Sequence, residues 1–474
     1  MRTTSAGLPS EGQFVLEVGV VLGPEGPLEQ SAVAVDGERF VAVGPLETMP
    51  ALYRGFPHVR RLDLALVPGF VDCHNHVTQS FAKALTCGEP SQLWRRLWAP
   101  LRVAMSPDDI YLATKWAGVE LLRGGFTTVV VAGEQAGENS AAAMRALDEI
   151  GLRSVFAYGF ADSADASMRS SARRTPSSTA QCMRLAEKAL ASRPTFPRIT
   201  VSLSCGTVHS ASRDLIRELS RLCAEAGIVF QMHTNEHTAE VEYCLNLHGR
   251  RPIELLADEG ALGPHSLLAH ATLVTPSEVT LLADSRAAVS YNPVASAWKG
   301  NGVAPALDFA ARGVRFGLGT DATRNDGFRL LDAAESAQRL TRGISTDDSS
   351  AGAGGLWVHA ATAGGADAAG LGDVTGTVAP GKHADFLLLT RNTPECQPSW
   401  DFAWELIRYY DRTNLVAAYI DGRIVLENGR PTACDVDELV TSNLDRARRV
   451  VNDAPIVRVH GPSRAAAQHR VSEE

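Results

Sequence analysis

The stretch Val67-Pro-Gly-Phe-Val-Asp-Cys-His-Asn-His76 decides the fold prediction, because an apolar run is followed at once by a pair of histidines. Alternate side chains of a β-strand point to the same face, so His74 and His76, at the end of a predicted strand, face the same way. Both imidazoles can then reach one metal ion. Such a pair also occurs as ordinary polar surface, and the stretch alone leaves the two interpretations open.

Seven similar apolar runs follow, and longer amphipathic stretches separate them. Runs of this length fit parallel strands buried on both faces, with helices between them. Ser106-Pro-Asp-Asp109 and Thr275-Pro-Ser-Glu278 are typical helix starts, since each places a capping residue before a proline and an acid. Eight such repeats predict an α/β protein with a (β/α)8 TIM-type barrel, whose site lies at the carboxyl ends of the strands. The predicted strands are Leu66–Cys73, Thr127–Ala132, Arg153–Tyr158, Ile199–Ser204, Ile228–His233, Ser266–His270, Ala287–Tyr291 and Val314–Gly319.

Side chains suited to metal binding end three further predicted strands. His233 ends the fifth, His270 the sixth, and Asp321 follows the eighth. The carboxyl ends of barrel strands meet at one rim, so we expect these side chains to converge with the first pair. Imidazoles and a carboxylate suit Zn²⁺ or Fe²⁺, with one position left open for water. Glu236, three residues beyond His233, can carry a proton from that water to the substrate, and a capping role at the next helix is the alternative.

The two ends of the chain share a different pattern. Residues 12–66 and 373–435 alternate short β-like runs with Gly and Pro turns. We expect these two segments to form one composite β-sandwich domain, with the metal-dependent barrel domain over 67–372 between them. Residues 436–474 are expected to form a C-terminal helix and tail.

The composition excludes several function classes. The 474 residues carry a formal net charge of −9 and are 45% hydrophobic, which fits a globular protein and argues against a nucleic-acid partner. No run of roughly 18 apolar residues suggests a membrane span, and no hydrophobic leader is visible. The eight cysteines form no C-x-x-C pair, which favours reduced thiols. We therefore expect a cytoplasmic protein that acts on a small molecule.

Several motifs, in the same order across about residues 60–430, resemble the amidohydrolase superfamily. More narrowly they resemble its deaminase and chlorohydrolase branch, which includes cytosine, guanine and S-adenosylhomocysteine deaminases and the s-triazine hydrolases. The motifs are Pro68-Gly-Phe-Val-Asp-Cys-His-Asn-His76, His233-Thr-Asn-Glu236, His270, Gly317-Leu-Gly-Thr-Asp321 and Gly376-Thr-Val-Ala-Pro-Gly-Lys-His-Ala-Asp385.

The resemblance implies a site for one divalent metal ion, with Zn²⁺ as the first choice and Fe²⁺ as the alternative. It also implies that Glu236 is the proton shuttle and that His270 polarises the substrate without binding the metal. Dinuclear relatives carry a carboxylated lysine at the end of the fourth strand, and Val201-Ser-Leu-Ser-Cys205 has no lysine, which favours one metal. The implied ligands are His74, His76, His233 and Asp321.

Two segments depart from the pattern of these deaminases where the relatives line the substrate pocket. Tyr291-Asn-Pro-Val-Ala-Ser296 has Tyr in place of the usual His, and Cys205-Gly-Thr-Val-His209 replaces Pro-His-Ala-Pro-Tyr. The long connections 77–105 and 160–180 are candidate lids or substrate walls, with surface decoration as the alternative. Tryptophan side chains can stack on a flat ring or belong to the core. The candidate substrate-binding residues are Trp94, Trp98, His209, Tyr291 and Trp298.

The expected reaction is hydrolytic deamination of an amino-substituted N-heterocycle or cyclic amidine by attack of metal-bound hydroxide, releasing ammonia. The predicted catalytic residues are Glu236, His270 and Asp321. The same site could instead hydrolyse a cyclic amide or displace chloride from a triazine-like ring. A non-catalytic binding module is a further alternative, but it predicts loss of the metal ligands, and all four are present. Because such barrels often assemble, we expect a homo-oligomer, a dimer or larger.

Overall fold

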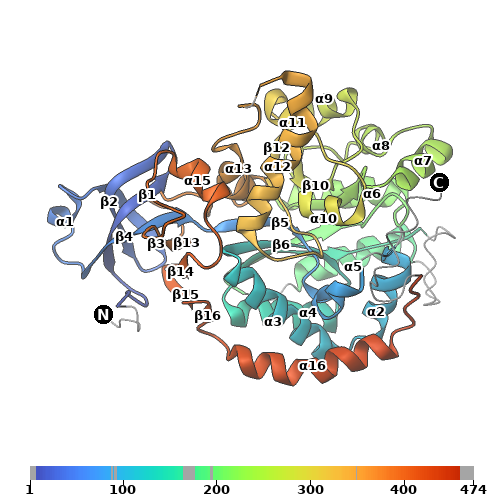
Figure 1. The fold of residues 1–474 in the computed structure, drawn as a ribbon. Helices are drawn as coiled ribbons and strands as arrows, with labels where there is room; N and C mark the ends of the chain where they lie inside the picture. The colour runs from blue at the N-terminus through green and yellow to red at the C-terminus, as the bar shows by residue number, and fades with distance from the viewer. Residues whose placement is uncertain are drawn as a thin grey trace.

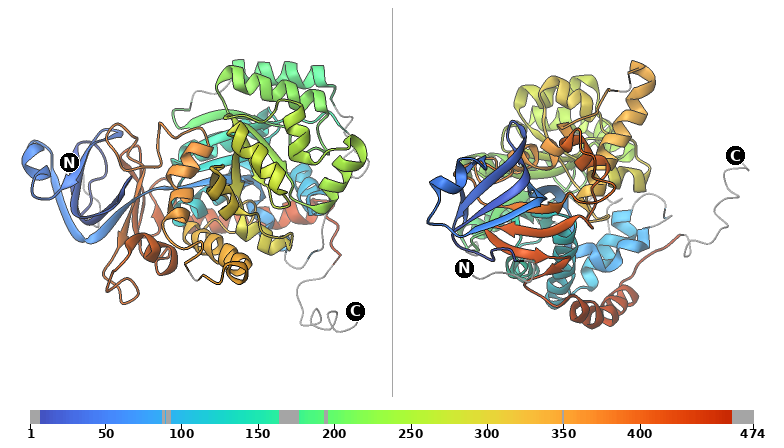
Figure 2. Two further views of the ribbon diagram at one scale, coloured as in Figure 1. Left: turned by 90° about the horizontal axis from the view of Figure 1, so that it is seen from above. Right: turned by 60° about the vertical axis from the view of Figure 1, so that its left-hand side comes forward.

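The computed structural model describes residues 7–86, 89, 93–163, 177–192, 196–348 and 350–459. Two eight-stranded sheets lie side by side, one inside a ring of helices and one at the edge of the molecule (Figure 1). Figure 2 shows the same arrangement from two further directions. The predicted α/β barrel with a second β-unit drawn from both ends of the chain is confirmed.

The barrel strands are parallel and pair in chain order. A bridge between Asn75 and Asp321 brings the last strand back to the first. Helices lie between successive strands, as a right-handed β/α succession requires. The strands are β5 (Phe70–Asn75), β6 (Phe126–Glu134), β7 (Arg153–Gly159), β8 (Ile199–Ser204), β9 (Phe230–Thr234), β10 (Ser266–His270), β11 (Ala288–Tyr291) and β12 (Arg315–Leu318).

The helices cover the outside of the barrel (Figure 1). The two predicted helix starts are confirmed, since Ser106 and Thr275 each form a capping box with the acid three residues later. The helices are α1 (Met49–Leu52), η1 (Val77–Thr86), η2 (Trp94–Trp98), α2 (Ala99–Ala104), α3 (Pro107–Arg123), α4 (Glu138–Ile150), α5 (Thr179–Ala191), α6 (Arg213–Ala226), α7 (Thr238–His248), α8 (Pro252–Asp258), α9 (Pro276–Ser285), α10 (Pro293–Lys299), α11 (Ala306–Arg312), α12 (Gly327–Thr346), α13 (Leu356–Ala361), α14 (Ala363–Ala368), α15 (Phe402–Arg408) and α16 (Val436–Asp453).

One predicted strand differs from the structure. The sequence predicted a single strand over Leu66–Cys73, but the chain leaves the second sheet at Pro68 and enters the barrel at Phe70. Gly69 lies between the two strands, and no larger residue fits there because a Cβ would lie 2.1 Å from the hydroxyl oxygen of Thr127. The apolar run is continuous, so hydrophobicity alone could not locate this boundary.

The second sheet has the strand order β16-β15-β14-β13-β4-β1-β2-β3, and its pairs are antiparallel apart from β1 with β4. The sheet curls, since Phe40 at its β3 edge exchanges backbone hydrogen bonds with the segment before β13, at Lys382 and Gly381. The rings of Phe386 and Tyr419 stack in its core with centroids 4.4 Å apart. Its strands are β1 (Phe14–Gly23), β2 (Gly26–Asp36), β3 (Arg39–Pro45), β4 (His58–Pro68), β13 (Phe386–Thr390), β14 (Leu415–Ile420), β15 (Arg423–Glu427) and β16 (Arg430–Pro431).

Helix α16 passes beside α3 in the view of Figure 1 and is joined to it by an ion pair between Arg449 and Asp109. The connection 77–105 contains η1, η2 and α2, whereas residues 164–176 of the predicted 160–180 excursion and the tail 460–474 lie outside the described residues. The exact domain limits stay predictions. No helix in the described ranges combines the length and the apolar character that crossing a membrane requires. The seven cysteines within the described residue ranges are all free thiols.

Candidate metal centre

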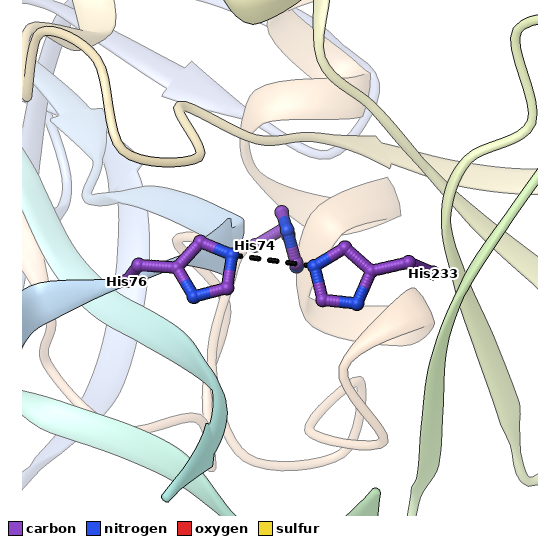
Figure 3. Close-up of side chains that lie close together, drawn as sticks. All are labelled: His74, His76 and His233. Carbon is purple, nitrogen blue, oxygen red and sulfur yellow. Dashed lines mark hydrogen bonds between the residues drawn. The ribbon is translucent and has the colours of Figure 1, made fainter. Parts of the chain in front are cut away.

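Four of the predicted ligands converge at the carboxyl rim of the barrel. Figure 3 shows His74 and His76, from the end of β5, facing His233 from β9. The Nε2 atoms of His76 and His233 are 3.2 Å apart. Asp321 completes the group, with its Oδ1 atom 3.3 Å from Nε2 of His76 and 3.7 Å from Nε2 of His74. The three imidazole nitrogens lie within 4.8 Å of one another, and Asp321 approaches the two histidines from the end of β5.

The spacing and the hydrogen bonds of these atoms fit a divalent ion. A tetrahedral zinc ion with bonds near 2.1 Å separates its ligand atoms by about 3.4 Å, close to the measured distances. Among the described residues, the buried Nε2 atom of His74 has no hydrogen-bond partner. Nδ1 of His233 lies 3.2 Å from the carbonyl oxygen of Gly206, so it carries the hydrogen and Nε2 keeps a lone pair. The donor set suits Zn²⁺ or Fe²⁺.

The electrostatics of the cluster keep its members in the protonation states that metal ligands need. Burial lowers the pKa of His74 well below its usual value and that of His76 to about 4, so both imidazoles are neutral at physiological pH. Burial alone would raise the pKa of Asp321, but the ammonium of Lys299 and the surrounding imidazoles outweigh it and hold that pKa below its usual value. The cluster thus offers lone pairs and one negative charge.

The backbone at the rim adopts conformations that non-glycine residues rarely take. His270, Asp321 and Asn235 have φ of 76°, 59° and 51°. Backbone hydrogen bonds hold Asp321 in place, since its N–H donates to the carbonyl of His74 at 2.8 Å. Unusual φ values of this kind cluster at functional sites, where surrounding contacts must stabilise them.

His270 lies beside the four ligands, but its hydrogen bonds favour a different role. The amide nitrogen of Asn292 donates to Nδ1 of His270 at 3.1 Å, and the Oδ1 of Asn292 accepts from Ser290. Nδ1 of His270 is therefore an acceptor, which leaves the hydrogen on Nε2. That Nε2 atom lies 3.6 Å from Oε1 of Glu236. The imidazole is suited to donate a hydrogen bond, whereas a ligand would need a lone pair there.

Sequence reasoning missed Lys299, at the end of α10. Its Nζ atom donates to Oε1 of Glu236 at 2.5 Å and to Oδ2 of Asp321 at 2.6 Å. The neighbouring Asn301 donates to the backbone carbonyl of Glu236 at 3.0 Å. Lys299 lies eight residues beyond β11, so the strand-end rule that found the other residues could not point to it.

Two of the predicted substrate-binding residues are enclosed by the fold, and their roles stay predictions. Tyr291 is fully buried, and its hydroxyl is hydrogen-bonded to Gln338 at 3.0 Å. Alternate side chains of a barrel strand point inward and outward, and Tyr291 faces the helices because its neighbour Ser290 faces inward. Trp98 is 7% exposed and packs in the main hydrophobic core. A core position was the alternative to stacking on a substrate ring.

The other three lie at more open positions. The ring of His209 packs against Tyr243 of α7, with centroids 4.3 Å apart. Trp94 and Trp298 are 38% and 50% exposed. Trp298 directly precedes Lys299 in the sequence of α10, and Lys299 contacts Glu236 and Asp321. Roles for these three residues stay predictions.

The comparisons with known proteins agree with this geometry. The model of the amidohydrolase family matches residues 65–425. A 5-methylthioadenosine/S-adenosylhomocysteine deaminase from Desulforudis audaxviator is 27% identical over 431 residues, which cover 88% of this chain and 94% of the relative. The predicted resemblance to the deaminase and chlorohydrolase branch is confirmed.

Two solved structures show the same fold. An adenosine deaminase from Xanthomonas campestris with bound zinc superposes with a TM-score of 0.80 at 24% identity, covering 94% of this chain and all of the other. The atrazine chlorohydrolase from Arthrobacter aurescens, complexed with zinc, also gives 0.80, at 19% identity, covering 92% of this chain and all of the other.

Proposed function

Because this chain belongs to the amidohydrolase family, we propose that it is a metal-dependent deaminase that hydrolyses the amino group of an aminopurine nucleoside and releases ammonia. The proposal is carried by the three imidazoles whose nitrogens lie within 4.8 Å of one another, with the Asp321 carboxylate 3.3 Å from one of them. Relatives named as deaminases of adenosine derivatives support the substrate class. The residues that would hold one ion, Zn²⁺ before Fe²⁺, are His74, His76, His233 and Asp321.

When bound, the ion would lower the pKa of a water molecule and so supply a nucleophile at neutral pH. Asp321 and Glu236 are placed to accept the proton that this water loses. His270 would donate its Nε2 hydrogen to the substrate and stabilise the negative charge that develops as the C–O bond forms. Glu236 then returns the proton to the amino nitrogen, the C–N bond breaks, and neutral ammonia leaves.

The position of Glu236 supports its role as the shuttle. Its Oε1 atom lies 3.6 Å from Nε2 of His270 and within hydrogen-bond distance of Lys299, which itself contacts Asp321. Burial alone would raise the pKa of Glu236, but His270 and Lys299 outweigh it and hold the pKa low. The carboxylate is therefore ionised and can accept a proton. Within the described residues, helix α7 has no side-chain cap hydrogen bond, and Glu240 in its first turn accepts the backbone N–H of Glu236 at 2.9 Å.

Ammonia release tests the proposal directly. Zinc-reconstituted protein would be given adenosine, 5′-deoxyadenosine, methylthioadenosine, S-adenosylhomocysteine, a chlorotriazine and a cyclic amide, with ammonia, chloride and ring-opened acid measured separately. We expect ammonia from at least one nucleoside and none from His233→Ala. Chloride or acid without ammonia would replace deamination with one of the alternative hydrolyses. A cytoplasmic location and assembly into a homo-oligomer stay predictions.

A further inference from the structure

Lys299 joins the two carboxylates that the proposed reaction uses. Its ammonium contacts Oε1 of Glu236 and Oδ2 of Asp321, while the Oδ1 atom of Asp321 faces the histidines. The side chain is 19% exposed, so it is enclosed without being fully buried. Lys299 is the last residue of helix α10. The helix ends there because Gly300 follows in the left-handed conformation, with a φ of 66°.

The location of this cation has a consequence for substrates. Glu236 can protonate a leaving amino group only if that group lies within hydrogen-bond distance of its carboxylate. The ammonium of Lys299 lies 2.5 Å from the same carboxylate. The amino end of a bound ring must therefore come within about 6 Å of a fixed positive charge, a range over which charges inside a protein interact strongly.

The net charge of the site also favours a neutral ring over a positively charged one. The side chains of Asp321, Glu236 and Lys299 together carry one negative charge, and a divalent ion would make the loaded site positive by one. A neutral ring that becomes anionic when water attacks it compensates that charge. A ring that enters as a cation would leave the site more positive, and attack would not restore neutrality.

We propose that Lys299 is a specificity-determining residue that selects neutral amino-heterocycles and rejects substrates whose ring is positively charged. The inference rests on the proposed function and narrows it, because the sequence left both amino-heterocycles and cyclic amidines open. Rejection of the wrong ligand by a like charge is a common source of specificity. If the ion pair had a structural role alone, Lys299→Gln would leave the dependence of binding on substrate charge unchanged.

Two nucleosides of the same shape separate these possibilities. 7-Methyladenosine has a positively charged ring, and 7-deaza-7-methyladenosine is its neutral counterpart. Isothermal titration calorimetry would give the Kd of each for zinc-loaded wild type, Lys299→Gln and Lys299→Arg. Lys188→Gln, on the exposed face of α5, removes the same charge from a residue outside the site and serves as the matched control.

We expect wild type to bind the cation at least about tenfold more weakly than its neutral counterpart. Lys299→Gln should reduce this ratio about tenfold, while Lys299→Arg and Lys188→Gln keep it. Equal binding of the two nucleosides by wild type would overturn the inference without any variant, and so would an unchanged ratio in Lys299→Gln. If wild type binds both nucleosides equally, or Lys299→Gln leaves the ratio unchanged, while wild type still releases ammonia from adenosine, the proposed function stands and only the role of Lys299 fails. No ammonia from any amine would refute both.

Discussion

Two buried clusters of charged and imidazole side chains lie at opposite ends of the barrel and differ in how their charges are satisfied. The first is the rim cluster described above. The second lies at the amino end of the strands, where Arg153, the first residue of β7, donates to Asp385 at 2.7 Å and also contacts Asp421. Nδ1 of His383 lies 2.5 Å from Asp421. This second cluster joins the barrel to the neighbouring sheet.

The difference shows why similar residues give different chemistry. At the amino end, the guanidinium of Arg153 lies against both carboxylates, as the ammonium of Lys299 does at the rim, and Arg198 adds a second cation 3.8 Å from Asp421. At the rim, imidazole nitrogens with lone pairs face one another, and the buried Nε2 of His74 has no partner in the described part of the chain. A cluster that pairs its own charges stabilises the fold, whereas one with unmatched lone pairs is suited to bind a cation. The following changes test that distinction.

The largest effect is expected from removing a ligand at the rim. His233→Ala should lower the metal content to near zero and reduce ammonia release on the order of 10⁴-fold, because the metal and its nucleophile are lost together. His248→Ala, which removes a histidine from the end of α7, is the matched control and should retain both. Metal content comes from elemental analysis of the purified proteins. Full metal content in His233→Ala would contradict the ligand assignment.

A smaller loss of activity is expected when the metal is kept and the proton shuttle is removed. Glu236→Gln should lower kcat by about 10² to 10⁴-fold, the usual contribution of general acid–base catalysis, with the zinc content unchanged. Glu242→Gln, the same change on the exposed side of α7, should leave kcat unchanged. Loss of zinc in Glu236→Gln would instead make Glu236 a ligand.

The cluster at the amino end should respond in stability and not in metal binding. Arg153→Met leaves two buried carboxylates without their cation, and we expect the free energy of unfolding to fall by about 3 to 5 kcal/mol. Urea denaturation measures this, and the folded protein should keep its zinc. Arg184→Met, on the exposed surface of α5, should change little. Zinc loss from folded Arg153→Met would show that the two clusters are coupled.

The smallest effect concerns the protonation of Glu240, next to the rim cluster. Burial raises its pKa from 4.5 to about 8, so the folded protein retains a proton that the unfolded chain releases. The free energy of unfolding should therefore fall as the pH rises through that window, and Glu240→Gln should remove the loss. We expect the stability of the variant relative to wild type to rise by about 1 to 3 kcal/mol between pH 5 and pH 8 in urea denaturation. A difference independent of pH would show that Glu240 is ionised in the fold.

The metal-ligand candidates found by sequence reasoning share one property, which is that each lies at or just after the end of a strand. His233 and His270 could be located this way because barrel topology brings strand ends to one rim whatever the helices do. Tyr291 also ends a strand, but its side chain points away from the barrel interior. Its hydroxyl there accepts a hydrogen bond from Gln338 of α12. Lys299 lies beyond a short helix, and its reach depends on where that helix ends.

The sequence by itself determined the succession of strands and helices, the four metal-ligand candidates and the family, because periodicity and strand-end residues are local properties of the chain. Only the tertiary structure decided that Tyr291 belongs to the core, that Asn292 lies 3.1 Å from Nδ1 of His270, and that Lys299 joins Glu236 to Asp321. These features depend on distances between atoms far apart in the sequence. Packing fixes such distances, and no residue type or spacing encodes them alone.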